Sequence, residues 1–103
     1  MDILTKEDVQ LYKTVIHNRL KRLDRKYFEM LKNRETPDYK TFVRVYLANK
    51  EALSEREQSI LDLRYGVHEE AMTLKKISKV IGVSPERIRQ VGTLAERKLS
   101  SYL

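Results

Sequence analysis

The chain has 103 residues, of which 21 are Lys or Arg and 15 are Asp or Glu, so its net charge is +6. A chain this short excludes a two-domain enzyme, and the absence of Cys excludes disulfides, thiolate metal sites and thiol nucleophiles. With 3 Gly and 2 Pro among many Leu, Lys, Arg and Glu residues, the composition indicates an all-α fold. The excess of positive charge favours a polyanionic partner.

The charge is unevenly distributed along the chain. Residues 1–50 carry +5, residues 51–72 carry −4 and residues 73–103 carry +5. The sequence has no run of about 20 apolar residues, the length that a membrane span needs, and its N-terminus lacks a signal-peptide pattern. We therefore expect a soluble, cytoplasmic protein that makes no membrane contact.

The first 34 residues predict one long helix. Thr5, with Asp8 three residues later, has the spacing of a helix N-cap, and the helix is expected to end near Arg34. Its apolar stripe consists of Val9, Ile16, Leu23 and Met30 at seven-residue spacing, with Leu20 and Tyr27 between them. The stripe indicates packing inside this protein or, as the alternative, a homodimer seam over residues 9–30.

A shorter helix is predicted up to about Asn49. Thr36 offers its N-cap, and Pro37 suits the first helical turn. The buried face is expected to consist of Phe42, Val43, Tyr46 and Leu47. These two helices make up the N-terminal region, residues 1–50, which we treat as separate from residues 51–103.

The next helix is predicted over residues 54–65. Ser54 is followed at the third position by Glu57, which matches a capping box, and Gly66 is placed to end the helix.

Two helices joined by a tight turn complete the chain. Thr73 and Ser84 are the expected N-caps, Gly82 stands where a left-handed turn residue is needed, and Pro85 begins a helix that runs to about Ser101. The residues expected on the buried side are Leu74, Ile77, Val80, Ile81, Val83, Ile88 and Val91, with the small Ser78 at the crossing. This spacing predicts a helix-turn-helix.

The last helix is the expected recognition helix. At 100° per residue, one side carries Ile88, Val91, Ala95 and Leu99, and the opposite side carries Glu86, Gln90, Thr93 and Arg97, with Arg87 and Arg89 on the flanks. Gln pairs with adenine edges, and Glu accepts from the cytosine amino group. We therefore predict that Glu86, Gln90 and Thr93 read bases; the alternative is an ordinary solvated face.

Contacts to DNA phosphates are expected at helix starts and from nearby cations. The candidates are Thr73, Lys79, Ser84, Arg87, Arg89, Arg97 and Lys98.

Four phrases of the second half resemble region 4 of the bacterial sigma-70 family, the module that reads the −35 promoter element. They are Leu53–Gly66, Thr73–Ile77, Gly82–Gln90 and Arg97–Leu99, and the most specific is Glu86-Arg-Ile-Arg-Gln90 after the Gly-Val-Ser turn. The DNA-binding domain of response regulators opens with a similar Leu-Ser-Glu-Arg-Glu phrase, but it does not usually carry Arg64-Tyr-Gly66 or the Glu86–Gln90 phrase.

The resemblance implies roles for individual residues. Glu86 and Gln90 match base-reading positions, and the helix over residues 54–65 matches the part that contacts the β flap of RNA polymerase with its apolar face. Pro85 stands where the family usually has another base-contacting Arg. Positions on or near the DNA backbone are matched by Arg56, Arg64, Thr73, Lys79, Arg87, Arg89 and Arg97.

Residues 1–50 do not resemble the region of sigma factors that opens the −10 element. The sequence thus predicts a bacterial or phage-encoded protein that binds double-stranded promoter DNA and RNA polymerase, with a separate region-2 protein for −10 recognition, as in a split sigma factor or a phage or mobile-element regulator. The alternatives are an autonomous dimeric repressor and an anti-sigma-like protein that binds polymerase. The N-terminal cations Arg19, Lys21, Arg22, Arg25 and Lys26 contact DNA or polymerase, or form a solvated face.

No catalytic constellation stands out in the sequence. His17 and His68 lie in different halves, and Glu69-Glu70 is more simply a solvated loop than an acid/base pair. No metal-ligand spacing is present. We therefore expect a non-enzymatic protein without a cofactor or metal.

Overall fold

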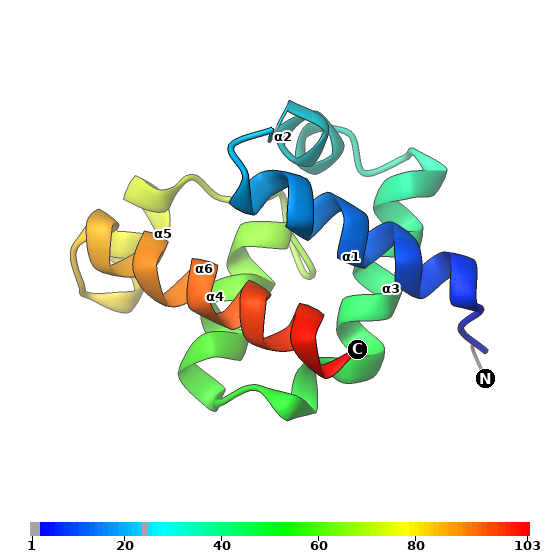
Figure 1. Ribbon diagram of the computed structural model, residues 1–103. Coiled ribbons are helices and arrows are strands. Elements are labelled where there is room, and N and C mark those ends of the chain that lie inside the picture. Colours follow the sequence, from blue (N-terminus) through cyan, green and yellow to red (C-terminus); the bar gives the residue numbers. More distant parts are fainter. Residues whose placement is uncertain (1–2, 24) are drawn as a thin grey trace.

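The computed structural model describes residues 3–23 and 25–103, and in these ranges the chain is all-α, as predicted. Figure 1 shows α6 beside both α1 and α4, with α5 at one end of the molecule. Their bounds are α1 Lys6–Leu20, α2 Arg25–Lys32, α3 Pro37–Asn49, α4 Glu55–Tyr65, α5 Leu74–Ile81 and α6 Pro85–Tyr102, with a short 3₁₀ helix, η1, at Lys50–Ala52.

The single long helix predicted for the first 34 residues is wrong, because the chain turns between α1 and α2. The α1 helix begins at the expected Thr5 and Asp8 capping box, but it ends at Leu20. Arg22 adopts a left-handed conformation with φ of 65°, which no right-handed helix accommodates. Leu23, expected in the apolar stripe, is 66% exposed. Asp24 lies outside the described residues.

The other predicted helices are confirmed. Side-chain caps at Thr36, Ser54, Thr73 and Ser84 each accept the backbone N–H three residues later. Two expected core residues are wrong, since Leu47 and Val80 are 45% and 59% exposed.

One hydrophobic core draws on residues 1–50 and on residues 51–103. From the first half it contains Tyr12, Val15, Ile16, Tyr27, Met30, Leu31, Tyr39, Phe42, Val45 and Tyr46, and from the second half Leu53, Leu61, Tyr65, Ala95 and Leu99. Tyr12 stacks on Phe42 with ring centroids 4.5 Å apart, and the Tyr65 ring meets Phe42 edge-on at 4.9 Å. Such aromatic contacts stabilise beyond the area they bury.

A second, smaller cluster joins the helix-turn-helix to α4. It is formed by Ile60, Met72, Ile77 and Ile88, with Leu63, Leu74, Ile81, Val83 and Val91 packed against it. The α6 helix therefore belongs to both clusters, with Ile88 near its start in one and Leu99 near its end in the other. Among the described residues, no helix is long and apolar enough to cross a membrane.

Candidate nucleic-acid interface

The turn between α5 and α6 has the geometry predicted for a helix-turn-helix. Gly82 adopts φ of 88° and donates its backbone N–H to the Ser78 carbonyl at 2.8 Å. The Ser78 hydroxyl donates to the Val83 carbonyl, which ties the end of α5 to the turn. Ser84 then caps α6 by accepting the Arg87 N–H at 3.1 Å. These bonds hold the first turn of α6 at the surface.

The first two turns of α6 present charged and polar side chains to solvent. Glu86, Arg87, Arg89 and Gln90 are all exposed, whereas Ile88 is buried between them. Arg89 donates to both carboxylate oxygens of Glu86, with Nε 3.1 Å from Oε2. This hydrogen bonding to Arg89 lowers the pKa of the Glu86 carboxyl. Glu86 therefore stays ionised as an acceptor, and its bonds to Arg89 compete with contacts of either side chain to a base or phosphate.

Thr93, expected on the same face, is less exposed than Glu86 and Gln90. Its side chain is half-buried, and its hydroxyl oxygen is buried without a hydrogen-bond partner in the part of the chain that the structure describes. Thr93 lies next to Gly92, which α6 buries against Ile60 and Leu61 of α4.

The residues predicted for phosphate contact lie in several environments. Lys79, Arg87 and Arg97 are exposed, and within residues 3–23 and 25–103 none of them forms an ion pair. Lys98 instead lies 3.3 Å from Glu57, the acidic residue of the α4 capping box. Thr73 accepts the Lys76 N–H and so caps α5.

Arg56 and Arg64 occupy opposite ends of α4. Arg56 is exposed in the first turn. Arg64 is half-buried: its Nη1 donates to the Met72 carbonyl at 3.0 Å, and its guanidinium carbon lies 5.4 Å from the centre of the Phe28 ring. Arg64 thus links α4, α2 and the segment that leads to Thr73.

The N-terminal cations lie in different environments. Arg19 is largely buried and pairs with Glu96. Arg25 pairs with Glu29 at 3.0 Å, and Lys26 pairs with Asp38 at 3.1 Å. Lys21 and Arg22 are exposed at the end of α1.

No pattern in the sequence indicates that Glu96 is buried in the core. Tyr27 and Tyr65 both donate their hydroxyls to its Oε2, at 2.8 and 2.6 Å, and only 1% of the residue is exposed. Arg19 Nε lies 3.0 Å from Oε1, an ion pair whose alignment is not that of a hydrogen bond. The partners are 31 or more residues distant in the chain, so no local motif marks them.

Burial raises the pKa of the Glu96 carboxyl, and the nearby Arg19 charge offsets only part of that effect. Burial also raises the pKa of the Tyr65 hydroxyl, with the Glu96 charge acting in the same direction. Both tyrosines therefore remain protonated donors. This network fastens the middle of α6 to α1, α2 and α4.

The apolar face of α4, expected to contact the polymerase β flap, is not open. Ile60, Leu61 and Tyr65 are at most 2% exposed, because the chain's own two clusters cover them. The exposed positions of α4 are Glu55, Arg56 and Ser59.

The described residues contain no group of three His, Cys, Asp or Glu side chains placed to hold a metal ion.

Residues 51–100 match the family model for sigma-70, region 4. The RNA polymerase sigma factor sigA of Arabidopsis thaliana is 53% identical over 47 residues, 46% of this chain and 9% of that protein. Sigma factor SigA4 of Synechococcus elongatus is 52% identical over 48 residues, 46% of this chain and 15% of that protein. SigA of a Bacillus species is 46% identical over 50 residues, 48% of this chain and 13% of that protein. No solved structure gives a significant match.

These matches confirm the predicted resemblance over the second half of the chain. The match to the family model begins at residue 51 and so leaves α1, α2 and α3 outside it. The matched segments amount to 9 to 15% of the length of these relatives.

Proposed function

We propose that this chain, whose residues 51–100 belong to the sigma-70 region 4 family, reads a −35-like promoter element with α6 and binds RNA polymerase. A separate region-2 protein supplies −10 recognition. The observation that carries the proposal is the outward face of α6, where Glu86 and Gln90 are exposed directly after the Gly82 turn. Residues 51–103 are the reading module in this proposal, and residues 1–50 are a helical support that shares its core.

The DNA-reading part is tested by selecting preferred duplexes from a random library and measuring affinity for selected and scrambled sequences. We expect Gln90→Ala and Glu86→Ala each to remove about 1 to 3 kcal/mol of discrimination at a base pair. Glu86→Ala also frees Arg89, so its affinity for scrambled DNA should stay equal or rise. The matched controls are Gln10→Ala and Glu7→Ala on the exposed side of α1. Unchanged sequence preference in both α6 variants would contradict the proposal that α6 reads bases.

The polymerase contact is proposed for the acidic segment over residues 51–72, because the apolar face of α4 is covered. Its outward carboxylates include Glu51, Glu55, Glu69 and Glu70. Affinity purification from the host should recover RNA polymerase together with a distinct region-2 protein. Charge reversal of Glu51 and Glu55 should release polymerase while DNA binding is kept. Recovery of the chain without polymerase would contradict this part.

We expect the protein to be a monomer when it binds DNA. Residues of the apolar stripe that suggested a homodimer interface pack inside the chain instead, since Ile16, Tyr27 and Met30 are at most 5% exposed. A repressor that reads a palindrome is a dimer with two-fold symmetry. Light scattering that gave twice the mass of one 12.2 kDa chain would favour the repressor instead.

A further inference from the structure

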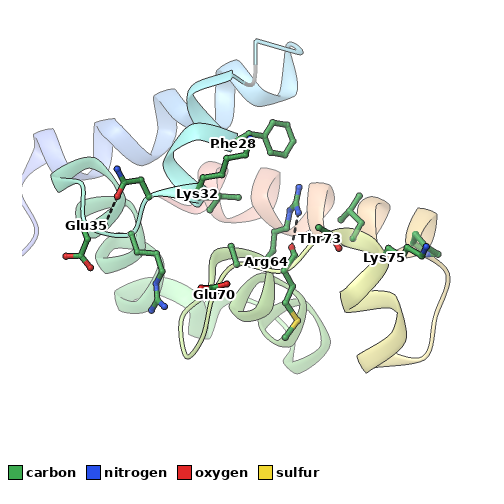
Figure 2. Close-up of a pocket in the computed structure, with 14 residues that line it drawn as sticks. Phe28, Lys32, Glu35, Arg64, Glu70, Thr73 and Lys75 are labelled. Atoms are coloured by element: carbon green, nitrogen blue, oxygen red, sulfur yellow. Dashed lines mark hydrogen bonds between the residues drawn. The ribbon is translucent and has the colours of Figure 1, made fainter.

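An open groove of about 1010 Å³ runs between α2 and the segment that leads into α5. Figure 2 shows Phe28 and Lys32 of α2 on one side of it, Thr73 and Lys75 on the other, and Arg64 between them. Leu31, Ala71, Met72 and Leu74 add apolar surface to the lining. One wall therefore comes from residues 1–50, outside the family match, and the other from the helix-turn-helix.

The groove adjoins the positions at which region 4 is expected to meet DNA. Arg64 and Thr73, both predicted for backbone contact, line it, and so does Pro85, the first residue of α6. A duplex whose major groove receives the start of α6 has its phosphates beside this helix. The groove extends from Thr73 to Lys32, so a backbone strand that is bound at Thr73 and follows the groove reaches α2.

The rim facing that strand is positively charged. Lys32, Arg34 and Lys75 are exposed, and across residues 3–23 and 25–103 none of them forms an ion pair. Two acidic residues line the groove, Glu35 and Glu70. Glu35 lies 3.9 Å from Lys40, so the negative charge of Glu70 is the one that remains to oppose these cations. Cations without a protein partner break no ion pair when they bind a phosphate, and their binding releases counterions condensed on DNA.

The two walls are fastened to each other. Arg64 donates to the Met72 carbonyl on one wall and lies against the Phe28 ring on the other. Tyr27, next to Phe28, donates to Glu96 of α6. These contacts hold α2 in place relative to Thr73 and α6. Lys32 is the last residue of α2, and Arg34 follows it by two positions.

We propose that Lys32 and Arg34, with Lys75 across the groove, bind the sugar-phosphate backbone of duplex DNA beyond the base pairs that α6 reads. Residues 1–50 thereby lengthen the DNA footprint of the region-4 module. This inference rests on the proposed function. Duplex DNA fits the groove better than an acidic protein segment because the groove is continuous with Thr73 and Pro85, where backbone contact is already expected.

The test compares Lys32→Ala/Arg34→Ala with Lys6→Ala/Lys13→Ala, a control that removes the same charge from positions of α1 outside the groove. Affinity is measured at several salt concentrations for a long selected duplex and for one trimmed to the base pairs that α6 reads. Thermal melting of both variants checks that they fold as the wild type does.

On the long duplex, the plot of log K against log salt has a negative slope. Loss of two phosphate contacts should make this slope less steep by about 1.8. The advantage of the wild type over Lys32→Ala/Arg34→Ala should then shrink about tenfold between 50 and 200 mM salt. Base preference should not change, the control should keep the wild-type slope, and all three proteins should bind the trimmed duplex alike.

Three results would overturn the inference. If the wild type selects a sequence but the groove variant keeps its slope on the long duplex, the groove does not bind DNA, although the proposed function stands. If the groove variant keeps DNA binding but loses RNA polymerase, an acidic protein segment is the occupant. If the wild type shows no salt-dependent DNA binding, the proposed function and this inference fail together.

Discussion

Glu96 is the residue with the most unusual environment, a carboxylate inside an aromatic core. Both of its tyrosine donors point at Oε2, and Arg19 lies on the side of Oε1. An amide cannot reproduce this pattern in either protonation state of the carboxyl, because its N–H₂ group directs two hydrogens towards the tyrosine donors or the guanidinium. We expect Glu96→Gln to lower the free energy of unfolding at pH 7 by roughly 1 to 3 kcal/mol in urea titrations. Glu51→Gln, at an exposed position, should have little effect.

Comparison of the wild type with Glu96→Gln also tests whether the pKa of Glu96 is raised or lowered in the folded protein. Because burial raises the folded-state pKa above that of the unfolded chain, this group contributes stability in full below about pH 4.3. That contribution is lost as pH rises through the folded-state pKa. The difference in unfolding free energy between wild type and Glu96→Gln should therefore shrink as pH increases. A difference that grows with pH would show that the Arg19 charge outweighs burial.

Gly66 and Gly82 both adopt positive φ, but their surroundings differ. A Cβ on Gly66 would lie 2.6 Å from the Ala71 backbone nitrogen, whereas one on Gly82 meets nothing within 4 Å. Gly82→Ala should cost roughly 1 to 2 kcal/mol from backbone conformation alone. Gly66→Ala should cost roughly 1 to 3 kcal/mol more, because the overlap forces backbone to move. Equal melting temperatures for the two variants would contradict this difference.

At the scale of elements, helices with a side-chain cap and a stop residue could be predicted from the sequence. Thr36, Ser54, Thr73 and Ser84 are local signals, and the bonds they form span three residues. The break after α1 could not be predicted, because neither Gly nor Pro marks it and the apolar spacing stays in phase across it. The burial of Glu96 depends on contacts between segments that are distant in the chain, and the spacing of apolar residues along one helix does not reveal such contacts.

The turn between α1 and α2 gives a prediction at this scale. Arg22 has φ of 65°, so Arg22→Gly removes the strain of a side chain in the left-handed region. We expect the variant to be more stable by up to about 1 kcal/mol, after the larger entropy loss of Gly is subtracted. Lys21→Gly, where φ is −93°, should instead destabilise by roughly 0.5 to 1 kcal/mol. Thermal unfolding of both variants checks the opposite signs.

At the scale of the whole molecule, the shared core couples both halves of the chain. Phe42 of α3 is fully buried and contacts Tyr12, Tyr27 and Tyr65. Phe42→Ala should lower the free energy of unfolding by roughly 3 to 5 kcal/mol. Amide hydrogen exchange in α6 should speed up with that in α3, because the two unfold together. Leu23→Ala, at a residue that is 66% exposed, serves as the control. Protection of α6 that survives Phe42→Ala would mean that the halves unfold separately.

The aromatic core also makes the protein its own spectroscopic probe. The chain has no Trp, and five of its six tyrosines are buried, with Tyr102 the exposed one. Tyrosine emission and near-ultraviolet circular dichroism therefore report on the core and not on the outward face of α6. In a DNA titration, labelled duplex would follow binding while tyrosine emission independently followed the core. A rise in anisotropy without a change in emission would mean that recognition leaves the packing behind α6 undisturbed.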